Sequence, residues 1–125
     1  MFNSQNKEVT FSIKASHLTG IPSYGNVYLG DKAFEYYNEK NVNDFVQIPW
    51  DQISHISASV ILGKKINRFA IFTKSNGHFT FSTRNNKKTL KSMGNYFPVE
   101  KMYRSQSLVS FFKKKIKNLF RSNKK

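Results

Sequence analysis

The amino-acid sequence predicts a mainly β protein: a small antiparallel, partly open barrel capped by one helix, followed by a C-terminal amphipathic helix. Three observations predict this fold. Apolar and polar residues alternate with a period of two in about seven segments, turn residues separate these segments, and helical spacing appears only toward the C-terminal end. The chain has 125 residues, of which 38% are hydrophobic and 15% aromatic, enough for one domain with its own core.

The expected strands follow one another closely along the chain. Alternation places them at residues 9–14, around Val27 and Leu29, at 33–38, at 45–50, at 56–62, and in both arms of a hairpin spanning 68–84. Pro49 cannot donate a hydrogen bond to a ladder, so it indicates a strand end or a sheet edge. Ile53 is out of phase with the strand that follows, which predicts a bulge or short turn. Gly25 and Gly30 are interpreted as turn glycines.

The hairpin allows two registers. A two-residue Asn-Gly loop would place a lysine on the core face. A three-residue loop with Gly77 in the left-handed conformation instead pairs Phe79 with Thr73 and Phe81 with Ile71. This second register is favoured, because it buries the apolar side chains and leaves the lysine exposed.

A helix is expected after the hairpin. Asn85 or Asn86 is a suitable N-cap, and Pro98 should end the helix. The apolar residues at helical spacing between them are Leu90, Met93, Tyr96 and Phe97. The predicted barrel-like domain therefore comprises residues 1–98, and residues 99–125 form a basic C-terminal segment.

That C-terminal segment predicts a second helix over residues 107–120. Its apolar side chains gather on one side and its Lys and Arg on the other, a pattern typical of helices at a membrane interface or in a groove of an anionic partner. The alternative is a helix packed on the barrel with a solvated outer face. The predicted membrane- or partner-binding residues are Leu108, Phe111, Phe112, Lys113, Lys114, Ile116, Lys117, Leu119, Phe120 and Arg121.

The charge is strongly positive and unevenly distributed. The net charge is +14; residues 1–51 hold four Lys and six acids (4 − 6 = −2), whereas residues 52–125 hold seventeen basic residues and one acid (17 − 1 = +16). A half with this balance attracts phosphate on lipids or nucleic acid, or an acidic protein surface. Lys greatly outnumbers Arg, which favours diffuse contact over the reading of bases.

No pattern in the chain indicates chemistry. There is no Cys, and the three His have no metal-ligand spacing, so no metal and no cofactor are expected. Seven acids offer few pairs for acid–base work, and Glu35 and Glu39 have no evident partner. We therefore expect a protein that is not an enzyme. The polar N-terminus and the lack of a 20-residue apolar stretch favour a cytoplasmic location.

Three segments resemble the ManO family, a group of short proteins filed as a domain of unknown function (family 956). They are GDKAFEYYN at residues 30–38, DFVQIPW at 44–50 and NGHFTFS at 76–82. The resemblance extends from about residue 9 to residue 120. Members are encoded in Gram-positive bacteria beside mannose-class phosphotransferase-system permeases, and the family provides no catalytic residues to carry over. The order of elements is also similar to pleckstrin-homology-like and GRAM-like modules, which argues function only by analogy.

The resemblance implies an accessory or regulatory protein of a mannose-class sugar transporter. We expect it to bind the membrane subunits of the permease at the cytoplasmic face, as a peripheral protein of the cell membrane, and to modulate sugar uptake. The alternatives are a nucleic-acid-binding regulator of the transporter genes, which the scarcity of Arg disfavours, and a general module for anionic membrane surfaces.

Overall fold

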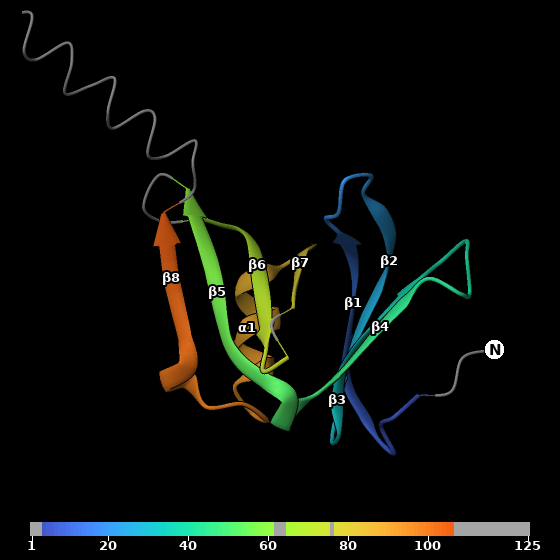
Figure 1. The fold of residues 1–125 in the computed structure, drawn as a ribbon, viewed down its shortest axis with the longest axis horizontal. Helices are drawn as coiled ribbons and strands as arrows, with labels where there is room; N and C mark the ends of the chain where they lie inside the picture. The colour runs from blue at the N-terminus through green and yellow to red at the C-terminus, as the bar shows by residue number, and fades with distance from the viewer. Residues whose placement is uncertain (1–3, 62–64, 76, 107–125) are drawn as a thin grey trace, which may run out of the picture.

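The computed structural model of the chain describes residues 4–61, 65–75 and 77–106. They form eight strands, one α-helix and two short 3-10 helices (Figure 1). The strands are β1 (Val9–His17), β2 (Ser23–Gly30), β3 (Ala33–Asn38), β4 (Phe45–Pro49), β5 (Ile53–Ile61), β6 (Lys65–Thr73), β7 (His78–Thr83) and β8 (Met102–Gln106). The helix α1 is Asn86–Met93, and the 3-10 helices are η1 (Trp50–Gln52) and η2 (Val99–Lys101).

The strands make one open sheet in the order β4-β3-β2-β1-β7-β6-β5-β8. All neighbours are antiparallel except β5 and β8, which are parallel. Figure 1 shows two groups, β1–β4 and β5–β8, which the short β1–β7 pairing joins, with α1 beside β6 and β7. The prediction of a mainly β protein with one helix after the seventh strand is confirmed, and the sheet is open because β4 and β8 remain its edges.

Two details predicted around β4 and β5 are confirmed. Pro49 is the last residue of β4, which is an edge strand, so its missing N–H interrupts no ladder. The register between β5 and β6 is irregular between Ile53 and His55, as the phase break in the sequence indicates.

The interpretation of Gly25 as a turn residue is wrong, because it lies inside β2. A Cβ added there would lie 1.9 Å from the carbonyl oxygen of Tyr37, so glycine is required for the close approach of β2 and β3. Gly30 ends β2, and an added Cβ would lie 2.4 Å from the carbonyl oxygen of Glu8.

The predicted hairpin register is shifted by two residues from the observed one. Phe81 pairs with Phe69 rather than with Ile71. The connection after Thr73 is longer than three residues; the backbone N–H of Gly77 donates to Thr73 Oγ1 (3.1 Å), and Gly77 is not in the left-handed conformation. Because a shift by two residues preserves the face of every side chain, Phe81 is still buried in the core.

The helix α1 begins as predicted and ends earlier. Asn85 is the N-cap, and its Oδ1 accepts a hydrogen bond from the third helical N–H at 3.0 Å. The helix ends at Met93 with Gly94 as its C-cap, so Pro98 does not end it. The residues after α1 form turns, in which the backbone N–H of Phe97 donates to the Met93 carbonyl oxygen (2.9 Å). The side chains of Met93 and Phe97 are both buried in the core.

The strand β8 was not predicted. It runs parallel to β5, with Ile56 opposite Met102 and Ser59 opposite Ser105. It brings residues of the C-terminal basic segment into the sheet. The predicted helix over residues 107–120 lies outside the described residues.

The core lies between the sheet and α1, and aromatic rings form its centre. Phe81 is fully buried and its ring lies 4.9 Å from that of Phe34, 5.5 Å from that of Tyr36 and 6.1 Å from that of Phe69, measured between centroids. At the other end, Trp50 donates its indole N–H to the Gly30 carbonyl oxygen (2.8 Å). These contacts join the two groups of strands in one core, to which α1 contributes Met93.

Candidate anion-binding face

Positive charge gathers where β6, β7, α1 and β8 meet. An open cavity of about 540 Å³ lies there, and we call it the basic cleft. Its four cationic side chains come from four places in the chain: Lys65 begins β6, Arg84 follows β7, Lys87 lies in the first turn of α1, and Arg104 lies in β8. None of the described residues that line the cleft is acidic. Such an arrangement produces a local positive potential that attracts anions.

A buried asparagine fixes the helix against the sheet beside this cleft. Asn86 Oδ1 accepts hydrogen bonds from the backbone N–H (2.7 Å) and the hydroxyl (3.1 Å) of Thr83. Its Nδ2 donates to the carbonyl oxygen of Ile66 at 3.0 Å. Asn86 is only 8% exposed. The positions of Arg84 and Lys87 relative to β6 are therefore set by a buried hydrogen-bond network.

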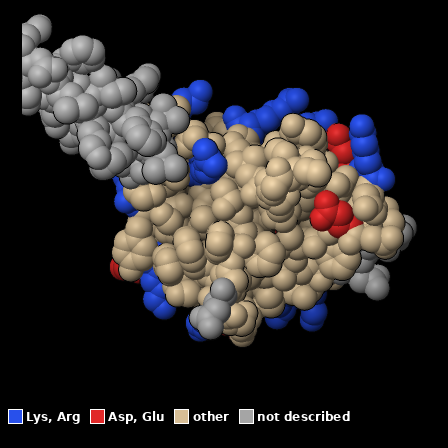
Figure 2. Space-filling view, turned by 45° about the horizontal axis from the view of Figure 1, so that its top comes forward, with Lys and Arg blue, Asp and Glu red and all other residues tan. Residues whose placement is uncertain are grey.

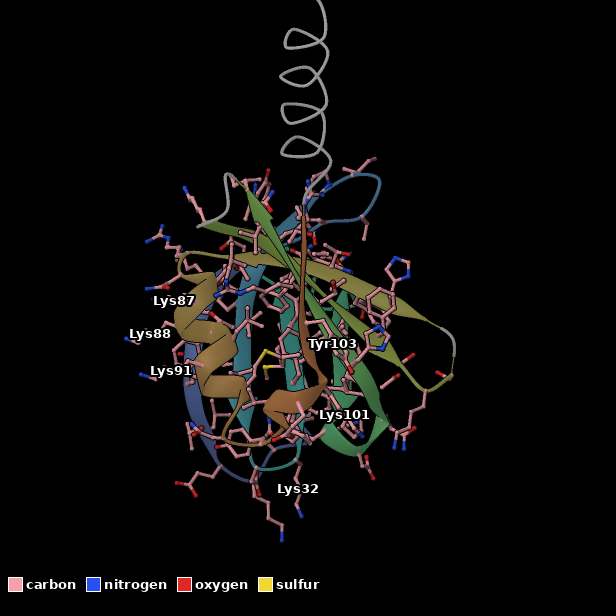
Figure 3. The ribbon with its side chains drawn as sticks, turned by 90° about the vertical axis from the view of Figure 1, so that its left-hand side faces the viewer. Lys32, Lys87, Lys88, Lys91, Lys101 and Tyr103 are labelled. Carbon is pink, nitrogen blue, oxygen red and sulfur yellow. The ribbon has the colours of Figure 1, made fainter. Side chains whose placement is uncertain are left out.

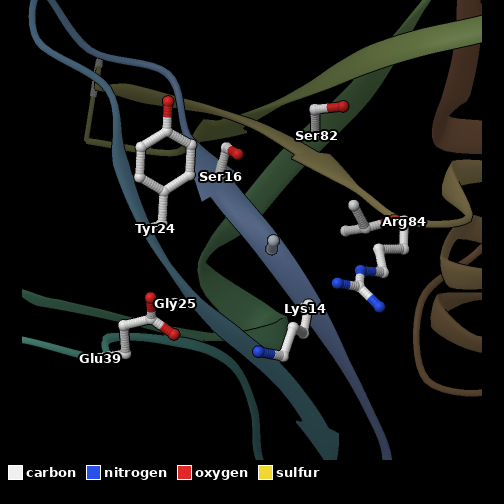
Figure 4. Close-up of a pocket in the computed structure, with 9 residues that line it drawn as sticks. Lys14, Ser16, Tyr24, Gly25, Glu39, Ser82 and Arg84 are labelled. Atoms are coloured by element: carbon white, nitrogen blue, oxygen red, sulfur yellow. The ribbon is translucent and has the colours of Figure 1, made fainter.

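A second cavity of about 410 Å³ adjoins the basic cleft and shares Arg84 with it. It lies over β1, β2 and β7, and Figure 4 shows the side chains of Lys14 and Arg84 near each other, with Tyr24 and Glu39 on the opposite side. The backbone N–H of Arg84 donates to the Lys14 carbonyl oxygen (3.1 Å), which holds the two residues together. Among the described residues that line this cavity, Glu39 is the acidic one.

The exposed side of α1 continues the positive surface. Lys87, Lys88 and Lys91 point outward from the helix in Figure 3 and line a third open cavity. The first turn of α1 holds no acidic residue, so the positive end of the helix dipole is not compensated there. We define the basic face as Lys14, Lys65, Arg84, Lys87, Lys88, Lys91 and Arg104.

Other parts of the surface have a different character. In Figure 2, Lys and Arg lie mainly around the margin of the view, and the centre consists of uncharged residues. A row of rings also crosses the strands: His55 stacks on Phe72 at 4.4 Å, Phe72 on His78 at 5.3 Å, and Tyr103 lies 5.9 Å from His55. His78 is exposed and His55 half-buried, as expected for surface histidines. Among the described residues, no cluster of His, Asp and Glu could hold a metal ion.

Glu35 is the polar residue that sequence analysis interpreted least well. It is fully buried in β3, and its carboxylate accepts four hydrogen bonds. The donors are Ser4 Oγ (2.5 Å), Gln5 N (2.8 Å), Asn6 Nδ2 (2.9 Å) and Tyr37 Oη (2.8 Å). Three of them belong to the N-terminal segment, which is thereby fixed on β3. A charged residue between the aromatic residues of β3 is the one signal in the sequence for this arrangement.

Two buried rings beside these networks have shifted pKa values. Burial raises the pKa of Tyr37 to about 12, and its hydrogen bond to Glu35 acts in the same direction. Burial lowers the pKa of His17, whose ring stacks on Phe81 at 4.8 Å, while the charge of Asp44 acts against this. Both residues are uncharged near neutral pH and belong to the core.

The ten residues predicted to bind a membrane or partner, between positions 108 and 121, lie outside the described residues. The cations of the basic face, apart from Lys14, were recognised only as part of the positive half of the chain, residues 52–125. In the part of the chain that the structure describes, no helix is long and apolar enough to cross a membrane.

The fold and its charge distribution define the class: a small, mainly β domain with an open sheet, one helix and a positively charged cleft. The chain belongs to the family described as Domain of unknown function (DUF956), whose model matches residues 1–116. This confirms the predicted membership of the domain of unknown function, family 956. No curated protein matches the chain.

Solved structures share the fold at low sequence identity. One is the C-terminal domain of an unknown protein from Leishmania infantum, with 11% identity, a TM-score of 0.62, and coverage of 69% of this chain and 80% of that one. Another is the Slm1-PH domain in complex with phosphoserine, with 9% identity, a TM-score of 0.52, and coverage of 70% of this chain and 90% of that one. These likenesses support the predicted pleckstrin-homology-like fold and concern the fold alone.

Proposed function

We propose that this protein is a non-enzymatic accessory protein that binds the membrane subunits of a mannose-class phosphotransferase-system permease at the cytoplasmic face and modulates sugar uptake. The observation that carries the proposal is the basic cleft, which four cations from distant parts of the chain line, while none of its described lining residues is acidic. The partner surface that matches it is anionic, as membrane headgroups and acidic protein surfaces are.

The makeup of the cleft supports binding rather than catalysis. In the described part of the chain, the titratable side chains that line it are Lys and Arg, with neither a carboxylate nor a histidine that could act as a general base. The likeness to the Slm1-PH domain, whose structure contains phosphoserine, supports a partner that carries phosphate. That likeness is one of fold, so it adds to the argument from charge without replacing it.

The predicted C-terminal helix supplies the apolar part of membrane binding in this proposal. A basic face holds a protein near an anionic surface by electrostatic attraction, which salt weakens. Apolar side chains of residues 107–120 would add a contact that salt does not weaken. The competing functions are a general affinity for anionic membranes and nucleic-acid binding. They differ from the proposal in the binding partners that are recovered together with the tagged protein.

The test is recovery of the tagged full-length protein from solubilised membranes at physiological salt. We expect the two membrane subunits of the permease to be recovered with it. A variant with Lys65→Gln, Arg84→Gln, Lys87→Gln and Arg104→Gln should recover at least about tenfold less of the permease subunits. The reason is that each Lys or Arg near an anionic surface contributes about 1 kcal/mol to binding before screening. All four side chains are exposed, so these changes should leave the fold intact.

The matched control removes the same charge elsewhere, with Lys32→Gln, Lys40→Gln, Lys74→Gln and Lys101→Gln, none of which lines the basic cleft. This control should behave like the unaltered protein. Recovery of nucleic acid or of soluble proteins without permease subunits would refute the proposal. Equal loss in both variants would show that net charge, rather than the basic cleft, governs binding.

A further inference from the structure

We propose that the basic cleft is a discrete site for a phosphate monoester, the dianionic group carried by some lipid headgroups and by small phosphorylated molecules. This inference deepens the proposed function, on which it rests for the anionic nature of the partner. The four cations that would hold the group are Lys65, Arg84, Lys87 and Arg104.

The backbone beneath each of these cations is already fixed. Lys65 pairs with Ile61 across the β5–β6 hairpin, and Arg104 pairs with Ala58 between β8 and β5. Arg84 is held by its backbone hydrogen bond to β1, and Lys87 by the capped first turn of α1. Binding therefore orders only the ends of long side chains, which reduces the entropic cost relative to a mobile loop.

The charge of the cleft favours a dianion over a monoanion. A phosphate monoester carries a charge of about −1.5 to −2 at pH 7, whereas a diester carries −1. Four positive side chains repel one another in the empty cleft, and none of the described lining residues is a carboxylate that would relieve the repulsion. Two of the four are Arg, whose planar guanidinium binds phosphate oxygens in a bidentate manner, and two are Lys, which act as point charges.

The cleft is also large enough and open enough for such a group. A volume of about 540 Å³ accommodates a phosphate together with part of the molecule that carries it. The helix α1 begins at the edge of the cleft, and Asn85, Asn86 and Lys87 all line it. Its uncompensated positive end adds to the field of the four side chains.

The repulsion in the empty cleft has a second consequence. Neutralising a cation there should leave the melting temperature unchanged or raise it, while the affinity for phosphate falls. A purely structural role for these side chains would produce the opposite effect on melting. The site therefore has a signature that separates binding from folding.

The experiment is a titration of the full-length protein, followed by backbone amide shifts at physiological ionic strength, with two soluble probes. Glycerol 3-phosphate is the monoester, and glycerophosphoglycerol is the diester. We expect shifts in the amides of the basic cleft and at least about tenfold tighter binding of the monoester, since charge-assisted contacts to phosphate weaken with each charge removed. The double variant Arg84→Gln with Lys87→Gln should lose this preference and melt no lower. The matched control Lys32→Gln with Lys74→Gln should keep it.

Vesicles distinguish the two sources of the group. Preferential sedimentation with phosphatidic acid over phosphatidylglycerol, at equal surface charge, identifies a lipid headgroup. Binding of glycerol 3-phosphate without that vesicle preference identifies a soluble phosphorylated molecule. No preference for the monoester in either assay, or a preference that survives the double variant, overturns the proposal. If the permease subunits are still recovered in that case, the proposed function stands and only the phosphate site fails.

Discussion

Replacing Glu35 by Gln is expected to destabilise the protein by roughly 2–4 kcal/mol, although the two side chains have nearly the same shape. The Glu35 carboxylate is fully buried and accepts two hydrogen bonds at each oxygen. The amide keeps one oxygen and turns an NH₂ group toward two donors. Those donors are either Ser4 Oγ and Asn6 Nδ2, or Gln5 N and Tyr37 Oη, depending on the orientation of the amide.

The magnitude follows from the number of donors that lose an acceptor. A hydrogen bond to a charged group contributes about 1.5–3 kcal/mol, so two such losses amount to roughly 3–6 kcal/mol. The neutral amide costs less to bury than the carboxylate, which offsets part of this loss. The remaining destabilisation should mainly affect the N-terminal segment, because three of the four donors belong to residues 4–6.

Urea denaturation measures the change in unfolding free energy, and amide exchange of residues 4–8 shows where the loss occurs. The control is Glu100→Gln, an exposed change that should stay within about 0.5 kcal/mol. Asn6→Ala combined with Glu35→Gln should cost less than the sum of the two single changes, because they remove one shared contact. A cost for Glu35→Gln below that of the control, or strict additivity, would refute the reasoning.

Three further predictions concern the core. Phe81→Ala should cost about 3–5 kcal/mol in urea denaturation, because it removes the ring at the centre of the core; a loss below about 1.5 kcal/mol would contradict that placement. Burial lowers the pKa of His17 in the folded state, so its contribution to stability is complete above about pH 6.5 and is lost as the pH falls through the folded pKa. His17→Gln should therefore show a smaller fall in melting temperature between pH 7.5 and pH 5 than the unaltered protein; an equal fall would contradict it. Asn86→Ala should cost roughly 2–3 kcal/mol and broaden the amide signals of α1, whereas the exposed change Lys88→Ala should do neither.

The sequence predicted the strands well because most of them have one side chain in two directed at the core. The alternation of β5 and β7 is visible in their burial as well as in their residues. The hairpin register was predicted two residues away from the observed one, since such a shift leaves the faces unchanged and alternation does not distinguish the two. β8 was missed for a related reason: Tyr103, Arg104 and Ser105 are all exposed, so this edge strand has no apolar periodicity.

The candidate site was harder to predict because its parts are distant in sequence. The positive half of the chain was evident, but the basic cleft depends on β8 placing Arg104 beside α1 and the start of β6. Glu35 illustrates the same limit. Three of its four partners are about thirty residues away in the N-terminal segment, and no local pattern connects the two. Long-range hydrogen bonds follow from topology, which periodicity does not specify.

The C-terminal segment leads to the last prediction. All eight strands and α1 end before Ser107, so a variant that ends at Gln106 keeps every element that the structure describes. We expect it to be soluble and to melt cooperatively. It should also still bind glycerol 3-phosphate, because the residues that line the basic cleft all lie between positions 61 and 104. It should no longer sediment with membranes, because the removed residues include seven of the 21 Lys and Arg and the predicted apolar side of a helix.

The double change Phe112→Asp and Phe120→Asp separates the apolar contribution from the charge. A fully buried Phe contributes about 1.5–3 kcal/mol, and burial at an interface contributes less. Lys near an anionic leaflet adds about 1 kcal/mol each before screening, so neither set alone should hold the protein firmly. The double variant should therefore leave the membrane while keeping most of the positive charge. If it still sediments, charge alone holds the protein there and insertion is refuted. If the variant that ends at Gln106 unfolds, the segment packs on the sheet and belongs to the core.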